Sequence, residues 1–176
     1  MARTLRNITF VYVPREDRIL AAVNAGLREA WSVWLTRRLT LALLERTGEY
    51  LRSRSDLAQR APAELRGEMH AFERDAAIAK TKGAMSVTPP DVLQSTASWA
   101  ELAERVAITP QGEDYRLELF GQSGDTAAAA VKGAELQRIL QMLQSEVAKA
   151  GWLAPPVKPQ TAPTPAASEP KPPFRH

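Results

Sequence analysis

The residues best suited to chemistry in this sequence are two adjacent arginines, Arg37 and Arg38, which closely follow Trp34. Guanidinium groups bind phosphate and carboxylate through paired hydrogen bonds, and aromatic rings stack on nucleic-acid bases. Together with Tyr12 from an earlier segment, these residues form a candidate surface for an anion or a nucleic acid. The alternative is that both arginines are exposed first-turn residues of a helix and that the aromatic rings pack the core.

Other reactive residue types are scarce. The absence of cysteine excludes disulfides, thiolate metal sites and cysteine nucleophiles. The two histidines, His70 and His176, are far apart in the sequence and indicate neither a metal cluster nor a catalytic triad. Adjacent acids at 16–17 and 113–114 are typical of solvated turns, and no phosphate-binding glycine loop or nucleophile-elbow motif occurs. We therefore expect no catalytic residue, metal or cofactor, and a protein that is not an enzyme.

The stretch from Trp31 to Leu51 positions the two arginines. Apolar residues alternate over 31–35, which is typical of a strand, and Leu39, Leu43, Thr47 and Leu51 lie four positions apart, which is typical of a helix. Thr36 stands at the changeover, where its hydroxyl can accept a backbone N–H of the first helical turn. The sequence therefore predicts a strand that leads directly into a helix.

This arrangement occurs twice in the chain. The sequence predicts strands at 8–13, 18–24, 27–35, 102–109, 115–120 and 126–132, and helices at 36–55 and 134–150. Equivalent residues keep a nearly constant offset, as shown by Pro14 with Pro110 and by Leu39 with Leu136. We interpret this spacing as two β-β-β-α units that repeat one pattern.

The predicted fold class is α+β, in which the strands of both repeats form one antiparallel sheet packed by helices. A single body at 1–152 contains repeat one at 5–55, a helical insertion at 56–90 and repeat two at 98–152. The remaining residues, 153–176, form a proline-rich tail that we expect to be disordered. Its P-x-x-P spacings could serve as a recognition segment for a partner, although such spacings arise by chance in proline-rich sequence.

Charge is divided unevenly along the body. Residues 1–60 carry 11 arginines against 6 acids, whereas residues 61–152 carry 9 basic and 13 acidic residues. This asymmetry is compatible with a basic contact surface in the first repeat, but the favoured explanation is a composition effect, because a GC-rich genome gives arginine in place of lysine. No apolar stretch reaches the roughly 18 residues of a membrane helix. We expect a cytoplasmic protein with no membrane contact.

Two resemblances add to this interpretation. The strings E-D-R at 16–18, W-L-T-R-R-L at 34–39 and H-A-F-E at 70–73 resemble those of an uncharacterised bacterial protein family, which implies no particular activity. The outline of residues 5–152, duplicated meanders that each end in a helix, is similar to Whirly and Pur-type folds. That similarity implies binding of single-stranded nucleic acid, but those folds have four strands per unit where three are predicted here.

The leading functional interpretation is a non-enzymatic adaptor that binds another protein through an uncovered sheet face, an open sheet edge or the tail. The alternative is a binder of single-stranded nucleic acid that uses the arginine-rich first repeat, with Tyr12, Trp31 or Trp34 as stacking platforms. The two differ in salt response, because phosphate contacts release counterions and weaken steeply as salt rises. The sequence sets neither the identity of a protein partner nor the oligomeric state.

Overall fold

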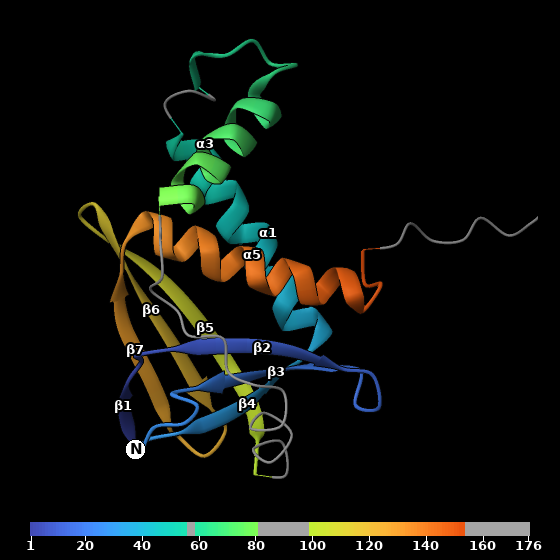
Figure 1. Cartoon of the computed structure of the whole chain (residues 1–176), viewed down its shortest axis with the longest axis vertical. Coiled ribbons are helices and arrows are strands. Elements are labelled where there is room, and N and C mark those ends of the chain that lie inside the picture. Colours follow the sequence, from blue (N-terminus) through green and yellow to red (C-terminus); the bar gives the residue numbers. More distant parts are fainter. Residues whose placement is uncertain (56–58, 81–98, 154–176) are drawn as a thin grey trace, which may run out of the picture.

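The computed structural model describes residues 1–55, 59–80 and 99–153. In these residues the chain forms seven strands and three helices (Figure 1). The elements are β1 (Ala2–Thr4), β2 (Ile8–Val13), β3 (Arg18–Val23), β4 (Trp31–Leu35), α1 (Arg37–Arg54), α3 (Arg66–Lys80), β5 (Glu101–Gln111), β6 (Asp114–Gly121), β7 (Thr126–Val131) and α5 (Gly133–Lys149).

All seven strands belong to one curled sheet in the order β1-β7-β6-β5-β4-β3-β2, which confirms the predicted α+β class. The prediction of six strands, all antiparallel, was wrong in two respects. β1 adds a seventh strand, and both β1–β7 and β4–β5 are parallel pairs. The β4–β5 pair is parallel because α1 and α3 lie between these strands in the chain and return it to the same end of the sheet.

The two ends of the sheet are tied together by Asn24, which has φ +54° and is buried. Its side-chain oxygen accepts the backbone N–H of Arg6 at 2.8 Å and that of Asn7 at 3.3 Å. Its amide nitrogen donates to the carbonyl of Thr4 at 2.8 Å. These bonds fix the bend between β1 and β2, so the first and last strands in the sheet order are held close together and the sheet is strongly curled.

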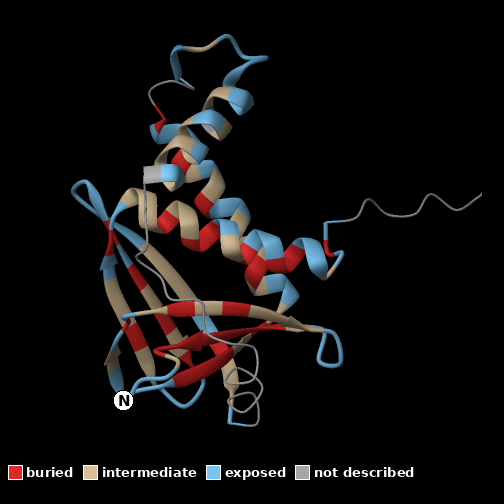
Figure 2. Cartoon of the chain, in the orientation of Figure 1, coloured by how far each residue is buried: buried red, intermediate tan, exposed pale blue. Residues whose placement is uncertain are grey.

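The core lies on the concave side of the sheet beneath α5 (Figures 1 and 2). Leu136, Leu143 and Val147 of α5 are almost completely buried, as expected from their three- and four-residue spacing. The helix is followed by Gly151 at φ +66°, and Trp152 then folds back into the core.

The helical insertion predicted at 56–90 contains α3, which packs against α5. The hydroxyl of Ser55, at the end of α1, donates to the Glu73 carboxylate of α3. Positions 56–58 and 81–90 of the insertion lie outside the described residues, as does the predicted tail beyond Leu153. None of the described helices has the length and hydropathy required to cross a bilayer.

Candidate functional site

Trp152 brings together two of the four residues predicted as an anion or nucleic-acid surface. The Arg37 guanidinium donates to the backbone carbonyl of Trp152 at 3.1 Å. The Tyr12 ring meets the Trp152 indole edge-on, with ring centres 5.8 Å apart and planes at 82°. Arg37 and Tyr12 therefore anchor the end of α5, a structural role that the sequence did not indicate.

Asp17 completes this cluster from the turn between β2 and β3. One of its carboxylate oxygens accepts both the Trp152 indole N–H at 2.9 Å and the Tyr12 hydroxyl at 3.1 Å. The bond from Trp152 lowers the pKa of Asp17, with smaller contributions in the same direction from Tyr12 and the positive charge of Arg37. The ionised carboxylate therefore holds the β2–β3 turn against the residues that follow α5.

The other two predicted residues lie elsewhere. Arg38 is exposed in the first turn of α1. Trp34 is half-buried on β4, and strand alternation places its ring on the face of the sheet opposite to the core residues Val33 and Leu35. Tyr12 packs against the core on the concave face, so Trp34 and Tyr12 project from opposite faces of one sheet.

Trp31, the third aromatic considered for stacking, is buried. Its indole N–H donates to the Glu101 carboxylate at 2.9 Å, and the Arg3 guanidinium lies 5.3 Å from the centre of its ring. Both the edge and one face of this ring are therefore occupied by residues of the chain itself.

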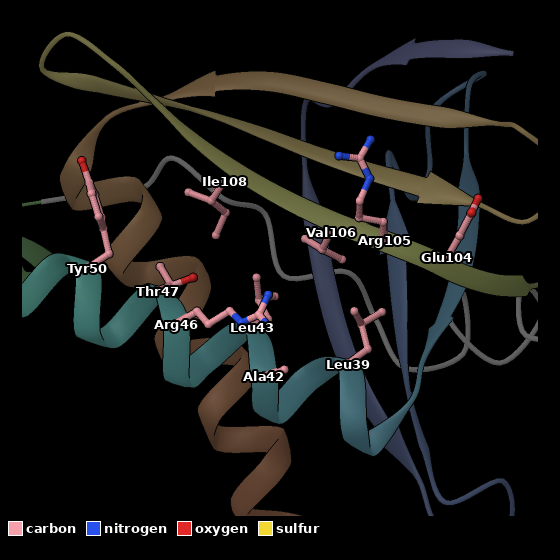
Figure 3. A pocket seen from close by; sticks show the side chains of 10 residues that line it. All are labelled: Leu39, Ala42, Leu43, Arg46, Thr47, Tyr50, Glu104, Arg105, Val106 and Ile108. Carbon is pink, nitrogen blue, oxygen red and sulfur yellow. The ribbon is translucent and has the colours of Figure 1, made fainter.

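A different feature presents apolar surface to the outside: a groove of about 370 Å³ between α1 and β5 (Figure 3). The floor comes from Leu39 and Leu43 of α1 and from Val106 and Ile108 of β5, and all four side chains are only partly buried. The volume falls in the usual range for ligand sites in proteins. We refer to this feature as the α1–β5 groove.

A small internal space of about 20 Å³ lies against the same floor. Leu43, Val106 and Ile108 line both this space and the groove. The space is just large enough for one water molecule, but its walls are apolar and offer that water no hydrogen bond. The floor of the groove is therefore not fully supported from below and has room to adjust to an apolar side chain.

The rim of the groove is polar and mostly basic. Arg46 of α1 and Arg105 of β5 are exposed, and Glu104 is the one acid among the lining residues. Strand alternation places the Arg105 side chain on the face of β5 that points away from α1, opposite to Val106 and Ile108 (Figure 3). The Arg105 guanidinium lies 3.8 Å from the centre of the Phe120 ring, a cation–π contact that fixes its position. Among the described residues neither arginine forms a salt bridge.

Sequence reasoning missed the α1–β5 groove because it used the apolar residues of α1 to predict a helix and did not decide which of them the core buries. The available signal was an excess of leucine, with Leu39, Leu41, Leu43 and Leu44 falling within six positions. One buried stripe of a helix needs only some of these positions, so such a run indicates a helix with more apolar surface than one contact can bury.

No cluster of three or more histidine or acidic side chains suited to a metal ion occurs in the described part of the chain. Comparison of the chain with protein-family models, with curated proteins and with solved structures finds no match. The two resemblances noted in the sequence therefore remain supported only by the strings and the element order on which they were based.

Proposed function

We propose that this protein is a non-enzymatic adaptor that binds a segment of another protein in the α1–β5 groove. The observation that carries the proposal is the open apolar floor, formed by Leu39, Leu43, Val106 and Ile108 beneath a charged rim. Apolar surface surrounded by polar groups is the usual character of a protein contact site. Binding there removes the floor from water, and that burial drives association.

The proposal retains two parts of the sequence interpretation. The order β-β-β-α occurs in β2-β3-β4-α1 and again in β5-β6-β7-α5, which supports treating the two units as repeats of one pattern. In this arrangement the α1–β5 groove lies where the helix of the first unit meets the first strand of the second. The cytoplasmic location expected from the cysteine-free sequence also remains part of the proposal.

The experiment is a selection of short peptides displayed on phage, repeated with a variant that fills the groove. Ala42 of α1 lines the groove, so Ala42→Trp places an indole in it. Ala148→Trp adds the same side chain at an exposed position of α5 and is the matched control. We expect selected peptides to bind the unmodified protein and Ala148→Trp but not Ala42→Trp, with similar thermal midpoints for both variants. Equal binding to both variants would refute a role for the groove.

The second candidate function is binding of single-stranded nucleic acid. It is favoured by the first turn of α1, which contains Arg37 and Arg38 and no acidic residue at the positive end of the helix dipole. Because Arg37 also holds Trp152, Arg38→Glu is the cleaner test. Anisotropy of a labelled oligonucleotide at about 50 and 200 mM salt should show binding that falls steeply with salt and is weakened by Arg38→Glu. No binding at the lower salt would remove this candidate.

A further inference from the structure

The long strand β5 has one edge that is paired with β6 along most of its length and a second edge that is paired only at its start. On the β6 side, pairing extends from Ala103 to Gln111. On the other side, β4 pairs with β5 only at Glu101 and Leu102. Beyond Leu102, the structure shows no backbone hydrogen bond to this second edge from any other described residue. In a strand every second residue points its N–H and C=O toward the same edge, so this part of β5 offers unpaired donors and acceptors.

The open edge results from the end of β4. The chain leaves β4 at Leu35, and Thr36 then caps α1 by accepting the backbone N–H of Leu39. β5 meanwhile continues for nine residues past its last β4 partner. The register shift between Ala103 and Arg105 is a bulge, which bends a strand and increases its twist. The α1–β5 groove therefore occupies the space where a strand in line with β4 would lie.

The usable length of this edge is limited at both ends. The bulge lies at one end, and Pro110, which has no N–H to donate, lies at the other. Between them, residues 105–109 form a regular stretch of five residues. At about 3.3 Å per residue this stretch spans roughly 16 Å, enough for a short added strand but too short for extensive pairing between molecules.

The charges beside this stretch select the partner. Arg46 and Arg105 line the groove, and Arg54 lies near one end of it, where it donates to the Tyr50 hydroxyl at 2.8 Å. Against these three arginines the lining contains only Glu104. An incoming strand whose carboxylates face the side of the sheet that carries Arg105 complements this charge, whereas a basic segment is repelled.

We propose that the partner binds the α1–β5 groove by strand addition. An extended, acidic segment of another protein pairs its backbone with residues 105–109 of β5. Alternate side chains of this segment are apolar and cover Leu43 and Ile108 on the side of α1. The carboxylates between them project from the opposite face of the added strand, beside Arg105. This inference rests on the proposed function and specifies the conformation and charge of the segment that the groove takes.

The test uses a labelled peptide of about seven residues that alternates valine with glutamate, whose affinity is measured by fluorescence anisotropy. A series of its analogues each carries one N-methylated backbone amide. Strand addition predicts that methylation at every second position weakens binding by about tenfold, the loss of one hydrogen bond, and that the positions between tolerate it. A helical peptide of this length instead uses only the amide hydrogens of its last three residues, because the first four N–H groups of a helix have no intrahelical partner, so methylation would weaken binding at consecutive positions near its C-terminus. Binding without the alternating pattern would refute strand addition while leaving the groove as the site.

Two further measurements test the rest of the inference. On binding, hydrogen exchange should slow at alternate amides within residues 105–109, whereas uniform protection or none would contradict pairing with β5. Replacing glutamate by lysine in the peptide, or Arg105 by glutamate in the protein, should weaken binding at least tenfold, and Arg105→Lys should preserve most of it. Equal affinity of the lysine peptide would refute the acidic partner. Failure of the valine–glutamate peptide to bind, while library peptides still bind in an Ala42-dependent manner, would overturn this inference and leave the proposed function standing.

Discussion

Removing the Asn24 side chain should destabilise the protein by an amount that can be worked out from its contacts. The side chain makes three hydrogen bonds, to the N–H groups of Arg6 and Asn7 and to the carbonyl of Thr4. Each such bond contributes about 0.5–1.5 kcal/mol to stability. Because Arg6 and Thr4 are exposed, water can partly replace the lost partners, and we expect Asn24→Gly to cost about 2–4 kcal/mol in total.

Glycine is the suitable replacement because it adopts the φ of +54° without strain. Asn24→Ala loses the same bonds and must also hold a left-handed conformation, which adds about 1–2 kcal/mol. Asn24→Asp keeps an acceptor for Arg6 and Asn7 but buries a carboxylate against the Thr4 carbonyl, so it should also destabilise the protein.

Urea denaturation of the three variants measures these differences, with similar m-values as the check on two-state unfolding. Hydrogen exchange should be faster at the amides of β1 in the glycine variant, since the bend that holds β1 has lost its bonds. An Asn24→Gly protein within about 0.5 kcal/mol of the unmodified one would show that pairing of β1 with β7 suffices, and the reasoning about this residue would be refuted.

Three other predictions concern stability. Leu136→Ala should cost about 2–5 kcal/mol of unfolding free energy because Leu136 is fully buried. Leu39→Ala should cost less because Leu39 is half-buried in the groove. Equal costs of the two substitutions in urea denaturation would contradict this difference. The pKa of Asp17 is lower in the folded protein than its ordinary value of 3.8. The ionised Asp17 carboxylate therefore contributes its full stabilisation at pH values above 3.8, and this stabilisation is lost as the pH falls through the lower pKa of the folded state. The thermal midpoint should therefore fall more steeply below about pH 4 than in Asp17→Asn, and parallel profiles would refute this. A Cβ on Gly121 would clash with the carboxylate end of Glu101, which would have to leave its hydrogen bonds to Trp31 and Ser123. Gly121→Ala should therefore cost about 1–3 kcal/mol, but much less in a Glu101→Ala background; additive costs would contradict the clash.

Much of the fold could be predicted from local patterns. α1 was expected to begin at Thr36 or Arg37 and end near Ser55, and it extends from Arg37 to Arg54. α5 was expected at 134–150 and extends from Gly133 to Lys149. These helices were predictable because their apolar spacing is long and regular, and Thr36 caps α1 as expected.

The errors occur where tertiary contacts decide the structure. The third strand was expected from Leu27 but begins at Trp31, because the N–H of Leu27 bonds the Asn24 carbonyl in a turn. β1 is only three residues long, and the bend that leads from it into β2 is held by the Asn24 side chain, which no local pattern shows. The α1–β5 groove depends on the separation between a helix and a strand far apart in the chain, so no local pattern distinguishes its residues from other apolar positions of that helix and strand.

The strand edges of this sheet differ in how they are protected, and the difference supports the assignment of the groove. The edge of β2 is covered by α5, whose buried Glu146 accepts the backbone N–H of Tyr12 at 2.8 Å. β1 is too short to template a long added strand. By contrast, β5 is bordered beyond Leu102 by a groove with a half-buried apolar floor and by arginines that form no salt bridge with any described residue. The edge of β2 is thus covered by a helix, and the edge strand β1 has only three residues. At the open edge of β5, by contrast, an added strand gains both backbone hydrogen bonds and apolar contacts.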